Sequence, residues 1–159
     1  MNVQVVEPRA DILVESTRSI GYTFESALAD IIDNSIGNGA THIDVRFSSI
    51  IPRYIAIIDD GCGMTPDELI IAMRYGSKNV NDQRAESDLG RFGLGLKTAS
   101  LSQCRKLTVI SKKNNVISAA SWDLDFIIAQ QGWSLKVYDH EEMVNQYNKA
   151  IPGILDELN

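Results

Sequence analysis

The feature that most constrains this chain is a glycine-rich stretch at residues 90–98, with the sequence GRFGLGLKT. Glycine at Gly90, Gly93 and Gly95 lets a ligand approach backbone N–H groups with no Cβ in the way. When such a loop runs straight into a helix, these N–H groups and the helix N-terminus form an anion-binding site. Because Lys97 adds a positive charge beside them, the stretch predicts a site for a phosphate-bearing ligand.

The charge pattern indicates that this positive character is local. The net charge is −6 and the pI is about 4.8, which argues against nucleic-acid binding by the domain as a whole. Nine of the fifteen Lys and Arg residues nevertheless fall within residues 74–113. We assign three of them, Lys78, Arg91 and Lys97, to a positive field around the glycine stretch.

Length and composition indicate a single globular domain. A chain of 159 residues suffices for one domain with a hydrophobic core. No apolar run approaches the roughly 18 residues that a membrane-spanning helix needs, and the N-terminal residues lack the pattern of a signal peptide. Cys62 and Cys104 form neither a disulfide framework nor a metal-ligand cluster. We therefore expect a cytoplasmic protein that does not bind membranes.

The hydrophobic pattern predicts helices and strands in an α+β order. Helices are expected at 9–19, 24–36, 65–75, 96–103 and 140–149, and strands at 43–47, 54–58, 107–111, 116–122 and 133–138. The polar residues 76–93 carry no such pattern and directly precede the phosphate loop, which indicates a lid. This order predicts a two-layer sandwich of helices and a mixed, largely antiparallel sheet.

The first two expected strands differ in their patterns. Apolar residues alternate with polar ones in the first, so that Ile43, Val45 and Phe47 should face the core. The second, at 54–58, is a nearly continuous apolar run, which is typical of a central strand.

Two familiar phosphate-binding motifs do not account for the glycine stretch. A P-loop has the pattern G-x-x-x-x-G-K-[ST] after a strand. Here Leu96 separates Gly95 from Lys97, and the preceding segment is polar. The dinucleotide-binding pattern G-x-G-x-x-G is absent. The stretch therefore belongs to another kind of phosphate site.

Three stretches together resemble the GHKL ATPases, the superfamily of type II topoisomerase ATPase subunits, ninety-kilodalton heat-shock chaperones, histidine kinases and MutL. Residues 30–41 resemble its N box, 59–64 (DDGCGM) its first glycine box, and 89–100 (LGRFGLGLKTAS) its second. Residues 107–114 resemble the strand that closes the adenine pocket in the chaperone branch. The resemblance covers roughly residues 20–125, and the second glycine box is closest to the microrchidia-like and related bacterial branch.

The resemblance implies a single Bergerat-type domain over residues 1–159, with its core at about 20–140, at the N-terminal part of a longer protein. It also implies ATP and Mg²⁺ as ligands. Asn34 would be the magnesium ligand, and Mg²⁺ needs few protein oxygens besides phosphates and waters. Asp59 would accept a hydrogen bond from the adenine amino group, since a buried carboxylate needs such a partner. Ser111 would share a water molecule with Asp59.

The glycine boxes supply the remaining expected ATP contacts. Gly63 and Met64 would line the adenine pocket. Backbone amides and side chains of the second box would surround the phosphates, and this group consists of Gly90, Arg91, Phe92, Gly93, Leu94, Gly95, Leu96, Lys97 and Thr98.

Asp30 is the candidate general base. The family usually carries a glutamate four residues before the magnesium asparagine, and this chain has an aspartate there. Aspartate is one methylene shorter, so its carboxylate reaches less far toward an attacking water. We expect slow ATP hydrolysis, and weak activity in this domain alone, because related branches complete the γ-phosphate site with a basic residue from a following domain.

These features favour an ATP-dependent conformational switch. ATP and Mg²⁺ would order the lid at 76–93, and the ordered lid would promote closure of a homodimer. Nucleic acid is not a predicted partner of this domain itself, although additional domains would be able to bind it. Two alternatives stay open: a histidine-kinase catalytic domain that phosphorylates a partner protein, and a nucleotide-binding regulatory module without turnover.

Overall fold

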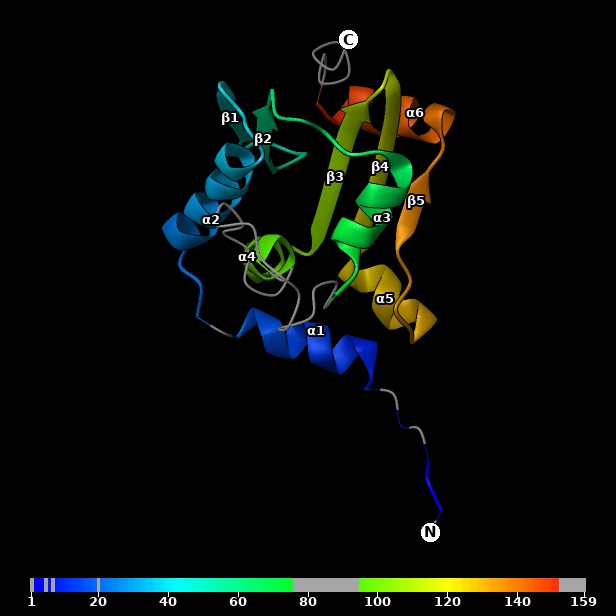
Figure 1. Ribbon diagram of the computed structural model, residues 1–159. Coiled ribbons are helices and arrows are strands. Elements are labelled where there is room, and N and C mark those ends of the chain that lie inside the picture. The colour runs from blue at the N-terminus through cyan, green and yellow to red at the C-terminus, as the bar shows by residue number, and fades with distance from the viewer. Residues whose placement is uncertain (1, 5, 7, 20, 76–94, 152–159) are drawn as a thin grey trace.

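The computed structural model describes residues 2–4, 6, 8–19, 21–75 and 95–151, and the statements below concern these residues. Its helices and strands follow one another as α1 (Ala10–Arg18), α2 (Phe24–Gly37), β1 (Ile43–Ser48), β2 (Tyr54–Asp59), α3 (Pro66–Met73), α4 (Gly95–Gln103), β3 (Lys106–Lys113), β4 (Val116–Asp123), α5 (Leu124–Gln130), β5 (Lys136–Tyr138) and α6 (His140–Ala150). Figure 1 shows their arrangement. The α+β class predicted from the sequence is confirmed.

The strands form two antiparallel sheets. One contains β1 and β2, and the other has the order β3-β4-β5. The β3–β4 turn places Asn114 and Asn115 at φ values of 52° and 62°, as a type I′ hairpin turn requires. Within the described chain β2 pairs only with β1, so the prediction of a central strand at 54–58 is wrong. Ala56 and Ile58 of its apolar run pack against the cluster formed with α6, whereas Ile55 is 49% exposed.

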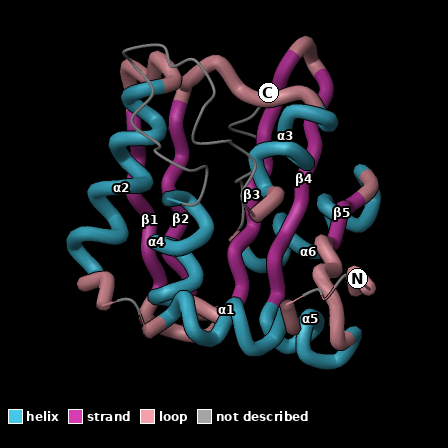
Figure 2. Tube along the Cα trace, turned by 60° about the horizontal axis from the view of Figure 1, so that its bottom comes forward, coloured by secondary structure: helices cyan, strands magenta, loops and turns pink. Residues whose placement is uncertain are grey.

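Helices cover both faces of the larger sheet. One face packs against α1, α3, α4 and α5 in the main core, which includes Leu69, Leu101, Trp122 and Ile127. Residues from α6 pack against the opposite face, where Met143 lies beside Ala119 of β4. Figure 2 shows α2, α3 and α4 together on one side of the strands. None of the helices in the described part of the chain is long and apolar enough to cross a membrane.

The β1–β2 hairpin turns its expected core face outward. Val45 and Phe47 are 37% and 78% exposed, so the prediction that they face the core is wrong. Helix α2 contacts this face at the end that carries Asp59, through a hydrogen bond from Ser35. On the other face, Ile58 packs against the cluster formed with α6. Alternation therefore predicted the strand correctly and its buried face incorrectly.

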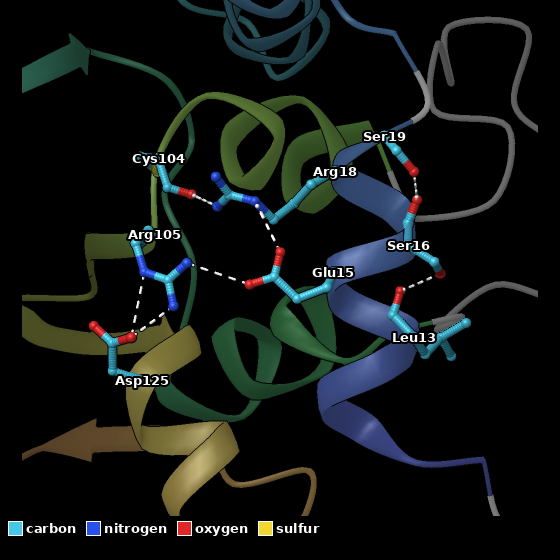
Figure 3. A network of polar contacts seen from close by, with 8 residues as sticks. All are labelled: Leu13, Glu15, Ser16, Arg18, Ser19, Cys104, Arg105 and Asp125. Atoms are coloured by element: carbon cyan, nitrogen blue, oxygen red, sulfur yellow. Dashed lines mark hydrogen bonds and ion pairs between the residues drawn. The ribbon is translucent and has the colours of Figure 1, made fainter.

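A polar network holds α1 against the rest of the molecule (Figure 3). Arg105 donates to Glu15 of α1 at 3.2 Å and to Asp125 of α5 at 2.6 Å. Arg18 of α1 donates to the backbone oxygen of Cys104 at 2.7 Å. Exposed ion pairs of this kind contribute roughly 0–1 kcal/mol each, so the network mainly fixes the direction of α1 while its apolar side supplies the stabilisation.

Helix α5 was missed in the sequence analysis. Asp123 forms its N-cap, because one carboxylate oxygen accepts hydrogen bonds from the backbone N–H groups of Asp125 and Phe126. An aspartate followed by an apolar run is an N-terminal helix signal. The helix is only 7 residues long, and this is too short for 3.6-residue periodicity to stand out.

Candidate functional site

Helix α2 carries the first two predicted site residues. Thr23 caps the helix by accepting a hydrogen bond from the Ser26 N–H at 3.2 Å. Asp30 and Asn34 lie one turn apart on one side of the helix, and both are half-buried. Asp30 accepts a hydrogen bond from the hydroxyl of Tyr22 at 2.8 Å. This contact fixes the direction of the Asp30 carboxylate, and it raises the pKa of Tyr22.

Asn34 presents an uncommitted side chain. Its backbone oxygen accepts hydrogen bonds from the N–H and the side-chain amide of Asn38, at 3.1 and 2.6 Å. Among the described residues, nothing hydrogen-bonds to its side-chain amide. This amide oxygen therefore remains available for a ligand. Magnesium ligation by Asn34 stays a prediction.

Asp59 stands at the end of β2 with both carboxylate oxygens engaged. Ser35 donates to Oδ2 at 2.9 Å, and the Gly61 N–H donates to Oδ1 at 3.0 Å. The residue is exposed, so our expectation of a buried carboxylate is wrong. Its position at the last residue of an edge-exposed hairpin leaves it at the surface, while the two hydrogen bonds hold it in one orientation.

The neighbouring Asp60 serves the turn, as the sequence indicated. Its carboxylate accepts hydrogen bonds from the hydroxyl and N–H of Thr41, at 2.6 and 2.7 Å, and from the His42 N–H at 2.8 Å. These bonds, with the Thr41 hydroxyl foremost, lower the pKa of Asp60 to about 2. The two adjacent aspartates thus have different tasks, and only Asp59 is directed toward α2.

The loop after β2 rests directly on β3. Gly63 has φ +62°, and a Cβ at this position would overlap the backbone oxygen of Lys112. The next residue, Met64, donates its N–H to the buried Ser111 hydroxyl at 2.7 Å. Ser111 therefore fixes the loop, and it lies within reach of the same loop that Asp59 orients through Gly61. The structure brings Asp59, Gly63, Met64 and Ser111 together.

Helix α4 begins at Gly95, the last glycine of the second box, and packs beside α2. Gly95, Leu96 and Thr98 are half-buried in its first turn. The other predicted residues of this box, Gly90, Arg91, Phe92, Gly93 and Leu94, lie outside the described residues, as does the lid expected at 76–93. Their phosphate contacts stay a prediction.

Lys97 points into the interior. It is 1% exposed, and its ammonium donates to the backbone oxygen of Ala72 at 2.6 Å. Ala72 lies in the last turn of α3, where a cation offsets the partial negative charge of the helix terminus. Burial lowers the pKa of Lys97 to about 8. In this conformation the lysine joins α4 to α3, and the phosphate contact predicted for it is not tested.

The sequence analysis missed two residues of the site, Tyr22 and Ser35. Ser35 lies on the apolar face of α2 and is 6% exposed. A lone hydroxyl on an apolar helix face needs a hydrogen-bond partner, and this need was the available signal. Tyr22 precedes the helix that carries its partner Asp30, and no short spacing rule connects them.

Comparison with known proteins identifies the family. The chain matches the histidine kinase-, DNA gyrase B- and HSP90-like ATPase family over residues 22–151. The chain belongs to this family of ATPases. The two-sheet α+β arrangement is consistent with the GHKL ATP-binding fold. Membership supports ATP binding and ATPase-type chemistry, which the sequence motifs had indicated.

The relatives come from two groups of GHKL proteins. The chain is 33% identical over 130 residues to the DNA mismatch repair protein MutL of Rhizorhabdus wittichii, covering 80% of this chain and 19% of that protein. It is 30% identical over 95 residues to ATPase morc-1 of Caenorhabditis elegans, covering 59% of this chain and 11% of that protein. The chain thus spans about a fifth or less of these relatives, and the match to a microrchidia protein supports the predicted branch.

A pH titration of stability will test the placement of Lys97. Unfolded lysine keeps its proton up to about pH 10.5, whereas buried Lys97 loses it near pH 8. Between these values the unfolded state binds more protons, so stability rises with pH. Relative to Lys97→Met, we expect the unfolding free energy of the wild type to gain on the order of 2 kcal/mol across this window.

Urea denaturation at a series of pH values between 7.5 and 10.5 measures this gain. Lys112→Met removes a lysine with no described side-chain hydrogen bond or ion pair and serves as the control, which should follow the wild type. Parallel curves for wild type and Lys97→Met would show that Lys97 is not buried in solution.

Proposed function

We propose that this chain is a GHKL ATP-binding domain that binds ATP with Mg²⁺, hydrolyses it slowly, and uses nucleotide occupancy as a conformational and dimerisation switch. The observation that carries the proposal is the geometry around Asp59. A carboxylate oriented by Ser35 and Gly61 adjoins a glycine loop that is fixed on Ser111. This arrangement offers a directed acceptor beside backbone that a flat ring can approach.

Asp59 would recognise the adenine amino group. Both its oxygens already accept one hydrogen bond, and each carboxylate oxygen has a second lone pair for another donor. Gly63 leaves the loop without a Cβ beside β3, and Met64 follows it with an apolar side chain. A ring bound here would therefore meet one acceptor and an apolar wall, which suits adenine.

Asn34 and Asp30 fit a magnesium and water site. The free Asn34 amide is a hard oxygen donor, and Mg²⁺ commonly binds one or two protein oxygens together with phosphates. Within the described residues no cluster of His, Cys, Asp and Glu competes for a metal. Mg²⁺ would supply neutralisation of phosphate charge, and Asn34 would hold it.

Asp30 would act as the general base, one helical turn from Asn34. The Tyr22 hydroxyl binds one carboxylate oxygen at 2.8 Å and leaves the other to accept a proton from water. Tyr22 is thus a positioning residue that compensates in part for the short aspartate, because it restricts the carboxylate to one direction. The short side chain of Asp30 still limits how closely its carboxylate can approach the attacking water, so turnover is expected to be slow.

Segment 76–93, which connects α3 to α4, would respond to the nucleotide as a lid. The two helices that flank it in the sequence are joined by the hydrogen bond from Lys97 of α4 to Ala72 of α3. Phosphates bound at the start of α4 would compete for the Lys97 ammonium, and this competition would link nucleotide occupancy to α3. The ordered lid would then favour homodimer closure.

Turnover by the Asp30→Asn variant is the test of the chemistry. We expect wild-type protein to release phosphate slowly from MgATP, and Asp30→Asn to lose about 100-fold of this rate with little change in ATP affinity, as for removal of a general base. Phosphate release and calorimetric ATP binding are measured on the same samples. Asp33→Asn, an exposed aspartate on the same helix, is the matched control.

Three outcomes would contradict parts of the proposal. Equal rates for wild type and Asp30→Asn would remove Asp30 from the reaction. ATP binding with no phosphate release from either protein would leave a regulatory module without turnover. Transfer of the terminal phosphate to a histidine of an added partner protein would instead support a kinase.

A further inference from the structure

A cavity lies between α1, α3 and the larger sheet. Its volume is about 500 Å³, within the range of roughly 300–1,000 Å³ that small-molecule sites occupy. None of the proposed ATP-site residues that the structure describes lines it. The lining residues are Pro8, Leu13, Ile70, Arg74, Tyr75, Trp122, Trp133 and Leu135.

Aromatic rings form one wall of this cavity. Tyr75 lies 5.0 Å from Trp133 and 5.4 Å from Trp122, measured between ring centroids, and the two tryptophans are 6.1 Å apart. Trp122 is fixed further, because its indole N–H donates to the Met73 backbone oxygen at 2.7 Å. The wall is therefore rigid, and such rings favour a planar apolar guest through edge-to-face and offset contacts.

One hydrogen-bond donor of the lining is free to meet a ligand. The exposed Arg74 guanidinium has no described side-chain hydrogen bond or ion pair. A guanidinium prefers an anionic partner with two oxygens, so Arg74 supplies the charge that a carboxylate would pair with. The Tyr75 hydroxyl is buried and does not open into the cavity, so this residue contributes its ring alone.

We propose that this cavity binds a small amphiphilic carboxylate, with a planar aromatic ring against the Tyr75–Trp122–Trp133 wall and its carboxylate paired with Arg74. Apolar walls alone would accept any apolar guest. The exposed Arg74 guanidinium selects one that also carries a negatively charged carboxylate. The cavity does not involve ATP, so the test of this proposal is separate from the test of the proposed function.

The natural probe is 4-phenylbutanoate, compared with the neutral 4-phenylbutan-1-ol. The chain has only two tryptophans, and both line the cavity, so tryptophan emission reports occupancy directly. We expect saturable quenching or a shift of this emission by the carboxylate, and about tenfold weaker binding of the alcohol, since hydrogen bonds to charged groups contribute about 1.5 kcal/mol or more.

Four variants locate the binding, measured by calorimetry. Ile70→Trp fills the cavity and should abolish binding, whereas Ile71→Trp, an exposed neighbour on α3 outside the lining, should preserve it. Arg74→Gln should weaken carboxylate binding about tenfold and leave the alcohol unchanged. Arg53→Gln, on the β1–β2 connection, is its control. Circular dichroism confirms that each variant is folded.

Each negative outcome overturns a different part of the proposal. No saturable binding of either compound up to millimolar concentration overturns the site. Equal affinity for the acid and the alcohol, or an Arg74→Gln variant that binds the acid like wild type, overturns the carboxylate assignment. Undiminished binding by folded Ile70→Trp shows that the ligand sits elsewhere and overturns the location.

Discussion

Replacing Gly63 with alanine is expected to lower the unfolding free energy by more than about 3 kcal/mol and to abolish ATP binding, since overpacking and backbone strain add at this position. Gly63 has φ +62°, which costs an L-residue roughly 1 kcal/mol or more. The added Cβ would also overlap the Lys112 backbone oxygen. Lys112 lies in β3 between the pairs Ser111–Ser118 and Lys113–Val116, so its oxygen can move aside only if the strand itself shifts.

Gly39→Ala is the matched control for backbone strain. Gly39 has φ +81°, and a Cβ there would meet no described atom within 4 Å. Gly39→Ala should lower the unfolding free energy only by what a positive φ costs an L-residue, about 1 kcal/mol. Urea denaturation gives both stabilities, and calorimetry gives ATP affinity. If Gly63→Ala lost no more stability than Gly39→Ala, the close approach of the loop to β3 would be absent in solution.

Much of the site could be predicted because the sequence signals were local. Capping residues such as Thr23 and Thr65 fix where helices begin, and both act as N-caps in the structure. Thr65 and Glu68 form a capping box, which a Thr and a Glu three residues apart signal. The resemblance, rather than local spacing, suggested that Asp59 and Ser111 belong to one site. Each of the capping inferences depends on residues within a few positions of one another.

The features that failed depend on contacts between distant segments. The position of α2 decides which part of the β1–β2 hairpin is covered and which is exposed. The alternating pattern that includes Val45 and Phe47 does not contain that position. The hydrogen bond from the Lys97 ammonium to Ala72, 25 positions earlier, was likewise not foreseen, while the phosphate contact expected for Lys97 stays a prediction. Tertiary packing decides such cases, because a side chain as long as lysine reaches either partner from one backbone position.

Asn in place of Asp59 is expected to lower ATP affinity by about 100-fold while leaving the fold intact, as loss of a charge-assisted hydrogen bond would require. The Gly61 N–H must meet an oxygen, so the new amide would place its oxygen toward Gly61 and its NH₂ group toward Ser35. The Ser35 hydroxyl can turn to accept this hydrogen bond, which preserves the loop. The adenine amino group would then lose an acceptor and meet a donor.

The relative affinities for ATP and GTP distinguish loss of the adenine contact from general damage to the loop. An amide presents both a donor and an acceptor, so Asp59→Asn should lose ATP affinity more than GTP affinity, and the ATP-to-GTP affinity ratio should fall. A disordered loop would instead weaken both nucleotides equally. Asp60→Asn is the control, because Asp60 holds the turn at Thr41 and His42 and does not face α2. Calorimetry with both nucleotides measures this ratio. An unchanged ATP-to-GTP affinity ratio in Asp59→Asn would mean that Asp59 does not contact the base. The carboxylate would then serve only to join α2 to the loop.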